Sequence, residues 1–339
     1  MYKTAHAHNK DKTRAIIPSM RWDGKEDFST WQNRSRSELT KILCLPFTKC
    51  DPEFKIEYKE DRGTFIETRF SFQSEEDFFV PCHFWSPKNA SGALPLIICL
   101  QGHTKGMHIS MGRPKYPGDE EDIKGGDRDF AIQAVKQGYC ALMMEQRCCG
   151  ELGGTENGPD CHFSSMAALL IGRTTFGERV WDVQRALDIT LQMFPEADKN
   201  TIVCMGHSGG GTTTLFASCL DTRIGYSMPS GYFCSFDYCI GDNVDNMYRH
   251  HCDCNNIPNI RLFFDMGDMT GMIAPRPLVI VLGKDDPLYP QQGVQKAFRE
   301  AQRMYTGAHA ADKLKLVIGD GGHRFYADIG WKAMNDFLR

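Results

Sequence analysis

Short apolar runs alternate with amphipathic stretches from residue 94 onward. The apolar runs are Leu94–Leu100, Thr201–Met205 and Pro277–Leu282, and Lys313–Ile318, which contains two lysines, is predicted to be the last strand. A run that is apolar at every position is typical of a parallel strand covered on both faces, because neither face meets water. Between these runs, apolar residues recur at helical spacing near residues 128–137, 177–194, 291–305 and 326–338. This alternation predicts an α/β fold with a mostly parallel central sheet and helices on both faces.

The first part of the chain has a different pattern. Residues 1–28 are polar and lack regular spacing, so we expect no regular element there. Ser29–Gln32 fits a capping box that opens a helix, and Pro46 is expected to end that helix.

Strict alternation follows this expected helix. Apolar and polar residues alternate over 66–72 and over 80–84, which predicts half-buried antiparallel strands. We therefore expect residues 1–90 to form an N-terminal extension, with a helix and antiparallel strands, packed on a main domain of residues 91–339.

The segment Gly206-His207-Ser208-Gly209-Gly210 has the spacing G-x-S-x-G. The run Thr201–Met205 precedes it as a predicted strand, and Gly211–Leu220 can form a helix after it. A serine on a sharp strand-to-helix turn exposes its hydroxyl as a nucleophile, and the strained turn needs small neighbours. Ser208 is therefore the candidate nucleophile. The alternative is a glycine-rich turn whose serine only caps the helix.

The acid and the base of such a site follow the serine along the chain. Asp286 lies just past the carboxyl end of a predicted buried strand, where it can orient a histidine. Asp285 is the adjacent rival, and both acids can also be plain turn residues. His323 follows the last predicted strand in a Gly-rich loop, and we expect it to be the general base. His207 directly precedes the serine and is expected to be a packing or pocket residue.

The chemistry requires these residue types because a serine hydroxyl is a poor nucleophile at neutral pH. An imidazole takes its proton and passes it to the leaving group, while the acid fixes the imidazole tautomer. The developing oxyanion needs preorganised donors, each worth roughly 3 to 4 kcal/mol. We expect one donor to be the backbone N–H of Gly209. The second is expected to be that of His103, in the loop after Leu94–Leu100, with neighbouring Thr104 as the alternative.

These features resemble the α/β-hydrolases grouped with bacterial acetylxylan esterases and cephalosporin-C deacetylases, near the dienelactone hydrolases. The resemblance extends from about residue 30 to the C-terminus. The segments that carry it are Gln101-Gly102-His103, Glu145–Gly150, Val180-Trp181-Asp182, Arg185–Asp188, Gly206–Gly211, Ala274–Pro277, Gly283-x-x-Asp286-x-x-x-Pro290 and Gly322-His323.

The resemblance implies an α/β-hydrolase fold, in which antiparallel strands precede the parallel part of the sheet. Its Gly-to-Asp-to-Pro spacing selects Asp286 over Asp285. Two departures concern the substrate and the loop geometry rather than the triad: Gln101 replaces a usual histidine, and Cys148 replaces a usual glycine.

The leading hypothesis is a serine carboxylesterase that works through an acyl-enzyme on Ser208 and needs no metal or organic cofactor. The resemblance implies deacetylation of acetylated sugars or similar small esters. Bulky residues near the expected oxyanion hole (His103, Met107 and His207) also favour a small acyl pocket. One alternative is a prolyl-oligopeptidase-like serine peptidase, although the chain has no room for a propeller. The other is a non-catalytic binding protein on the same scaffold, which would usually have lost a triad member.

Charge and hydropathy limit the classes of partner that the protein is expected to bind. The chain has 39 basic and 43 acidic residues among 339, a net charge of −4, and this near balance argues against a nucleic acid or an anionic membrane. The expected partner is a small-molecule ester, and a homo-oligomer is compatible with the sequence. No apolar stretch is long enough to span a bilayer. The first residues contain no apolar signal region, so we expect a cytoplasmic protein.

The fourteen cysteines are expected to be free thiols. Cys99, Cys140 and Cys204 fall in predicted buried strands, where a thiol behaves as a small apolar side chain. The run His250–Cys254 offers metal ligands, but their spacing does not match C-x2-C or separated pairs. We therefore expect no metal there, and expect this run to line the pocket entrance or pack beneath it.

Overall fold

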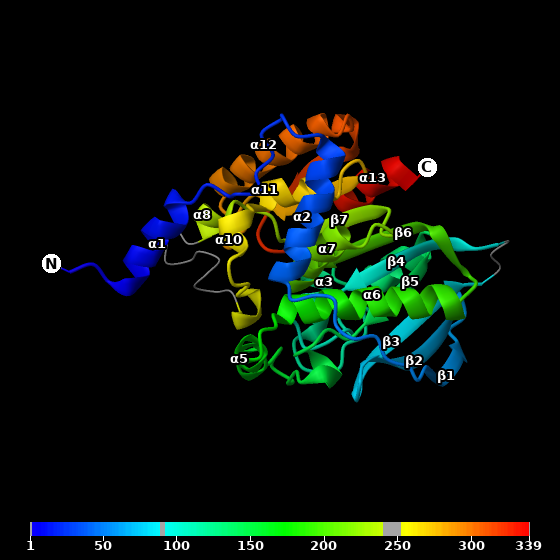
Figure 1. Cartoon of the computed structure of the whole chain (residues 1–339). Helices are drawn as coiled ribbons and strands as arrows, with labels where there is room; N and C mark the ends of the chain where they lie inside the picture. The colour runs from blue at the N-terminus through cyan, green and yellow to red at the C-terminus, as the bar shows by residue number, and fades with distance from the viewer. Residues whose placement is uncertain (1, 89–91, 240–251, 339) are drawn as a thin grey trace.

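A nine-stranded sheet forms the centre of the computed structural model, which describes residues 2–88, 92–239 and 252–338 (Figure 1). The strands are β1 (Lys55–Asp61), β2 (Phe65–Glu75), β3 (Phe78–Pro87), β4 (Leu94–Leu100), β5 (Cys140–Met144), β6 (Ala197–His207), β7 (Tyr226–Ser230), β8 (Leu278–Gly283) and β9 (Leu314–Gly319). Their order in the sheet is β1-β2-β3-β5-β4-β6-β7-β8-β9. The pairs β1–β2, β2–β3 and β3–β5 are antiparallel, and all later pairs are parallel. This confirms the expected fold class.

Helices cover both faces of the sheet. In the described part of the chain they are α1 (Ala5–Ala15), α2 (Phe28–Ile42), α3 (Asp119–Gly126), α4 (Phe130–Lys136), α5 (His162–Leu170), α6 (Thr175–Met193), α7 (Gly209–Leu220), α8 (Phe236–Cys239), α10 (Ile260–Phe263), α11 (Met266–Met269), α12 (Gln291–Gly307) and α13 (Ala327–Leu338). Helices α2, α6, α7 and α12 contribute to one apolar core, and α4 and α13 to the other. Along β4, Leu96 and Ile98 enter the first core while Ile97 and Cys99 enter the second. A strand buried on both faces in this way has to be apolar at every position.

Two expectations for the N-terminal part were wrong. Residues 1–28 contain helix α1, which extends away from the body in Figure 1. None of its residues is buried, so no apolar periodicity marks it, and the Thr4 hydroxyl caps it by accepting from Ala7 N–H at 3.2 Å. Helix α2 is capped by Asp27, whose carboxylate accepts from Thr30 N–H at 2.9 Å, rather than by a box at Ser29–Gln32.

Two strands lack the pattern that would have predicted them. Strand β1 is exposed along nearly its whole length, as an edge strand can be, and polarity alternates only over its first four residues. Strand β7 is five residues long and contains Pro229, which usually argues against a central strand.

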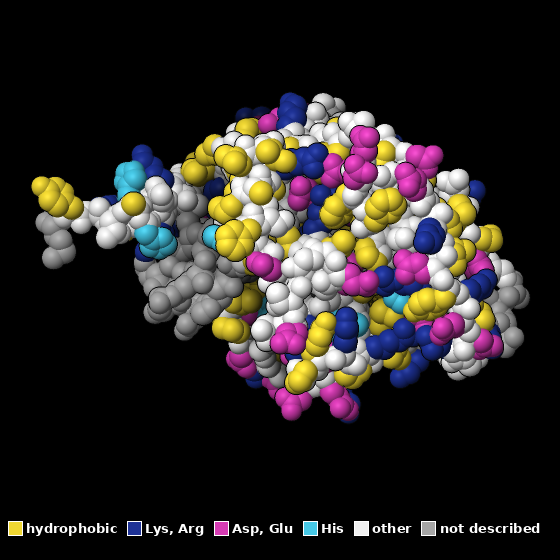
Figure 2. Space-filling view, turned by 90° about the horizontal axis from the view of Figure 1, so that it is seen from below, with side chains coloured by type: hydrophobic (Ala, Val, Ile, Leu, Met, Phe, Trp, Pro, Cys, Tyr) yellow, Lys and Arg dark blue, Asp and Glu magenta, His cyan; other side chains and the backbone are white. Residues whose placement is uncertain are grey.

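The face of the molecule in Figure 2 shows no extended patch of a single charge sign. Acidic and basic side chains are interspersed over the face in Figure 2. Within the described residues, no helix is both long enough and apolar enough to cross a membrane. No disulfide joins any of the fourteen cysteines, all of which lie in the described residues.

Candidate active site

Ser208 occupies the turn between β6 and α7. Its backbone has φ 56° and ψ −119°, a conformation that costs a non-glycine residue about 1 to 3 kcal/mol. The neighbours have to be small. A Cβ on Gly210 would lie 2.1 Å from the carbonyl oxygen of Leu100, and one on Gly206 would lie 2.6 Å from the backbone of Gly210. The glycines of the motif therefore allow the strained turn to lie tightly against β4.

The structure brings His323 and Asp286 together. His323 Nδ1 lies 2.7 Å from Asp286 Oδ2, and the carboxyl side chain is fully buried. The other carboxyl oxygen, Oδ1, accepts from Leu288 N–H at 3.0 Å. Asp285, the rival acid, is exposed. The Nε2 atom of His323 is buried, and it has no hydrogen-bond partner among the residues that the structure describes.

The segment Ser230-Gly231 contacts both the turn at Ser208 and the ring of His323. Ser208 N–H donates to the carbonyl of Ser230 at 2.8 Å. At the next residue, a Cβ on Gly231 would lie 2.9 Å from Cε1 of His323 and 2.6 Å from Cε1 of His207. The two imidazole rings are 4.5 Å apart, centroid to centroid. His323 thus lies beside the residue that directly precedes Ser208.

His207 is fully buried and has a structural contact, as expected for a packing residue. Its Nδ1 lies 3.1 Å from the hydroxyl of Ser230. Burial lowers the pKa of His207 well below its ordinary value, and the neighbouring His323 and Arg128 lower it further. A ring that is neutral at pH 7 adds no positive charge next to His323.

The loop after β4 lies against the serine turn. A Cβ on Gly102 would lie 3.0 Å from the Cβ of Ser208. The N–H of Thr104 already donates to the carbonyl of Gly102 at 2.8 Å, so that donor is occupied. The imidazole of His103 covers Gly209, where an added Cβ would lie 2.7 Å from the ring. Because Gly209 is the first residue of α7, the helix offers no acceptor to its N–H.

A buried carboxyl group that the sequence analysis did not single out anchors this loop. Glu145 Oε1 accepts from Gln101 Nε2 at 2.7 Å and from Met107 N–H at 3.0 Å. Burial raises the pKa of Glu145 to about 7, although its backbone donors oppose the shift. Gln146, which follows Glu145, donates to the carbonyl of Gln101 and accepts from the hydroxyl of Thr213 at 2.6 Å. Gln101, the first departure from the family pattern, thus has a structural role as a hydrogen-bond donor to Glu145.

The segment after β5 also carries a buried ion pair and a strained cysteine. Arg147 Nε lies 2.7 Å from Asp182 Oδ2, and the Asp182 carboxylate raises the pKa of Arg147 against the effect of burial. Cys148 has φ 70°, in the left-handed region that favours glycine. The family's usual glycine at this position therefore has a conformational reason.

A model of the Abhydrolase family matches residues 10–314. The curated protein "Putative hydrolase YtaP" of Bacillus subtilis (strain 168) is 28% identical over 248 residues, which cover 72% of this chain and 77% of that protein.

Three similar solved structures share the fold. The "putative acetyl xylan esterase" of Bacteroides fragilis NCTC 9343 has a TM-score of 0.79 and 18% identity, over 97% of this chain and 84% of that one. The glucuronoyl esterase from Solibacter usitatus has a TM-score of 0.68 and 15% identity, over 94% and 96% of the two chains. Acetyl xylan esterase 1 from Thermoanaerobacterium sp. JW/SL YS485 has a TM-score of 0.57 and 18% identity, over 97% of each.

The family match covers most of the chain, and the strand order, the covered sheet and the turn at Ser208 agree with it. The resemblance inferred from the motifs is therefore confirmed, and the chain belongs to the Abhydrolase family, with an α/β-hydrolase fold.

Proposed function

We propose that the protein is a serine carboxylic-ester hydrolase with Ser208 as nucleophile, His323 as general base and Asp286 as the acid that orients it. The observation that carries the proposal is the state of His323. Its Nδ1 is held at 2.7 Å by a buried carboxylate, while its buried Nε2 has no partner among the described residues. An imidazole held on one nitrogen and unpaired on the other is arranged to accept a proton.

The reaction then has two stages. The hydroxyl of Ser208 attacks the ester carbonyl carbon as its proton passes to Nε2 of His323. The tetrahedral intermediate collapses to an acyl-enzyme, and the imidazolium returns the proton to the leaving alkoxide. Water attacks the acyl-enzyme with the same histidine as base, which releases the carboxylic acid and restores the serine. Asp286 keeps its charge throughout and stabilises the imidazolium.

The backbone N–H groups of Gly209 and His103 are the proposed oxyanion donors. Gly209 begins α7, where the N–H has no intrahelical acceptor and the helix dipole favours negative charge. His103 is preferred over Thr104 because the Thr104 N–H already donates to Gly102. Each such donor is worth about 3 to 4 kcal/mol to the transition state.

Acetylated sugars or similar small esters are the proposed substrates. The basis is the family resemblance, together with structural neighbours that are named as acetyl xylan and glucuronoyl esterases. Met107 and His207 are large and buried, and the proposal places them beside a small acyl pocket. The proposal includes no organic cofactor. A cytoplasmic location and the oligomeric state stay predictions.

Substitution of the nucleophile tests the proposal. Ser208→Ala should lower kcat for p-nitrophenyl acetate by about 10⁵-fold or more while the melting temperature stays close to that of the wild type. Ser218→Ala is the matched control, since Ser218 is a buried serine on α7, the helix that follows Ser208, and it should retain activity. Substantial turnover by a clean Ser208→Ala preparation would refute the assignment.

Labelling with a fluorophosphonate probe, together with a peptide-cleavage assay, tests the two alternatives, a non-catalytic binding protein and a serine peptidase. A non-catalytic scaffold would not label at Ser208, whereas an esterase should label there and nowhere else. A peptidase would label too, but it would cleave peptide amides faster than matched esters. The expected result is labelling at Ser208 with no measurable peptide cleavage.

A further inference from the structure

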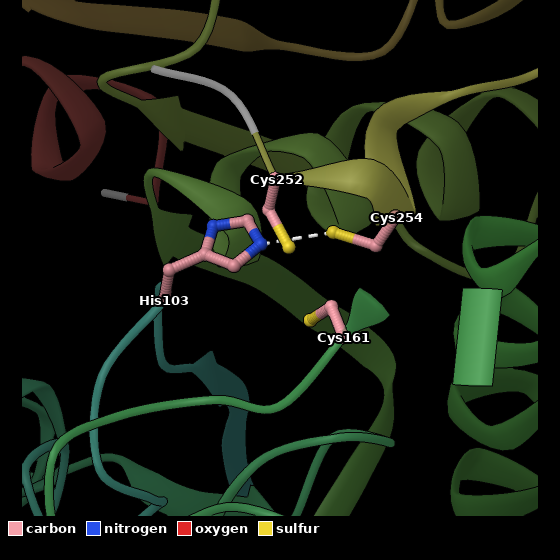
Figure 3. A group of neighbouring side chains, drawn as sticks. All are labelled: His103, Cys161, Cys252 and Cys254. Atoms are coloured by element: carbon pink, nitrogen blue, oxygen red, sulfur yellow. Dashed lines mark hydrogen bonds between the residues drawn. The ribbon is translucent and has the colours of Figure 1, made fainter. Parts of the chain in front are cut away.

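Four side chains with metal-binding atoms converge from three separate segments (Figure 3). His103 comes from the loop after β4, and Cys161 directly precedes α5. Cys252 directly precedes the 3-10 turn Asp253–Asn255, and Cys254 lies within that turn. One donor atom from each residue lies within 4.8 Å of all the others. Within the cluster, His103 Nε2 lies 2.9 Å from Cys254 Sγ.

We propose that these four residues form a zinc site. Three thiolates and one imidazole are a donor set typical of closed, tetrahedral structural zinc. Zn–S bonds of about 2.3 Å and Zn–N bonds of about 2.0 to 2.1 Å place the ligand atoms of a tetrahedron roughly 3.5 to 3.8 Å apart. The observed cluster is compatible with that size after side-chain shifts of about 1 Å. Cys161 and Cys254 are buried while His103 and Cys252 are partly exposed, which leaves a route for the ion.

Arg179 provides an independent argument for thiolates at this place. Its guanidinium is almost fully buried and donates to the carbonyl of Arg147 at 2.7 Å. It also contacts Cys161 Sγ at 3.6 Å and Cys254 Sγ at 3.7 Å. Across residues 2–88, 92–239 and 252–338, no carboxylate is recorded as its ion-pair partner. A buried cation needs a counter-charge, and zinc bound by three thiolates carries one net negative charge that meets this need.

A disulfide explains the arrangement less well. A bridge between two of the three cysteines would leave the third thiol and the imidazole of His103 without a common role. It would also remove the two negative charges that the bridged thiolates could offer to Arg179. His162, at the start of α5, already contacts Asp253 in the segment 252–254, with Nδ1 lying 2.7 Å from Oδ2. These two segments are therefore connected at the surface without any cysteine.

The site has a structural consequence for the loop that carries His103. The metal would bind Nε2 of a ring that lies over Gly209, so it would connect this loop to α5 and to the segment 252–254. If the backbone N–H of His103 is an oxyanion donor, zinc positions that donor; this clause alone rests on the proposed function.

Metal analysis of the full chain tests the proposal. Protein purified without chelators and under reducing conditions should contain one zinc per chain by inductively coupled plasma mass spectrometry. After zinc is removed, Co²⁺ should give thiolate-to-cobalt charge transfer and the strong d–d bands of tetrahedral cobalt. Cys252→Ser should weaken Co²⁺ binding by more than about 100-fold, since even outer-shell changes cost 10- to 100-fold.

Two controls keep the outcomes distinct. Cys50→Ser makes the same change at a cysteine of similar partial exposure outside the cluster, and it should bind Co²⁺ like the wild type. Ser208→Ala should keep its zinc, so failure of the esterase proposal leaves this result intact. Reduced wild-type protein that binds neither Zn²⁺ nor Co²⁺ would overturn the inference. A disulfide among Cys161, Cys252 and Cys254 in protein purified without reductant and free of zinc would also overturn it.

Discussion

Asp286→Asn should nearly abolish hydrolysis without unfolding the protein, because it moves the imidazole proton to the wrong nitrogen. In the wild type, Asp286 Oδ1 accepts from Leu288 N–H at 3.0 Å and Oδ2 faces His323 Nδ1 at 2.7 Å. An asparagine that keeps its oxygen on Leu288 must point its NH₂ group at Nδ1. Nδ1 then becomes an acceptor, the proton sits on Nε2, and Nε2 cannot take the proton of Ser208.

The alternative amide orientation is also unfavourable. It would place the NH₂ group against the N–H of Leu288, so that a buried donor loses its acceptor at a cost of about 1 to 3 kcal/mol. The expected loss in kcat is therefore roughly 10³- to 10⁴-fold. That loss corresponds to about 4 to 5.5 kcal/mol in activation free energy.

The assay is steady-state hydrolysis of p-nitrophenyl acetate, with circular dichroism and thermal melting to verify the fold. Asp285→Asn is the matched control, since it makes the same change at an exposed neighbour. Its kcat/KM should stay within about twofold of the wild type, as for most surface substitutions. If Asp285→Asn lost the activity and Asp286→Asn kept it, the assignment of the acid would be wrong.

Three further outcomes are expected. The kcat/KM for p-nitrophenyl acetate should exceed that for the octanoate, because each methylene that a pocket cannot hold costs about 1 to 3 kcal/mol; a maximum at octanoate would contradict the small pocket. Burial lowers the pKa of His207 in the folded protein. The contribution of neutral His207 to the free energy of unfolding is therefore present above its pKa in the unfolded chain, about 6.5, and is lost as the pH falls below that pKa. The free energy of unfolding, measured in urea, should thus fall by up to about 1.4 kcal/mol per pH unit below that value, and His207→Phe should reduce this slope; equal slopes would refute it. A chelator under reducing conditions should lower the melting temperature of the wild type more than that of Cys252→Ser, and an equal effect on both would count against bound zinc.

The candidate residues of the active site could be named from the sequence, although the contacts that support their roles come from the tertiary structure. The G-x-S-x-G spacing between an apolar strand and a helix predicted the turn at Ser208, where the structure has φ 56°. The family resemblance, through its Gly-to-Asp-to-Pro spacing, selected Asp286, the acid that lies against His323. Such local motifs can be read from a sequence because the carboxyl ends of parallel strands gather at one edge of a sheet. Elements whose stability does not come from apolar packing, such as the exposed helix α1, could not be read in this way.

The sequence by itself determined the α/β class, most of the buried strands and the order of the candidate triad, because these depend on local periodicity and on short motifs; β7, which contains Pro229, was an exception. Only the tertiary structure brought His103 and Cys161 to Cys252 and Cys254. The run His250–Cys254 alone has unsuitable spacing for a metal, and two of the four proposed ligands come from segments far away along the chain. His250 and His251 lie outside the described residues. Cysteines that look like small apolar residues along the chain can be ligands in space, because a tetrahedral site is defined by distances between side chains and not by sequence separation.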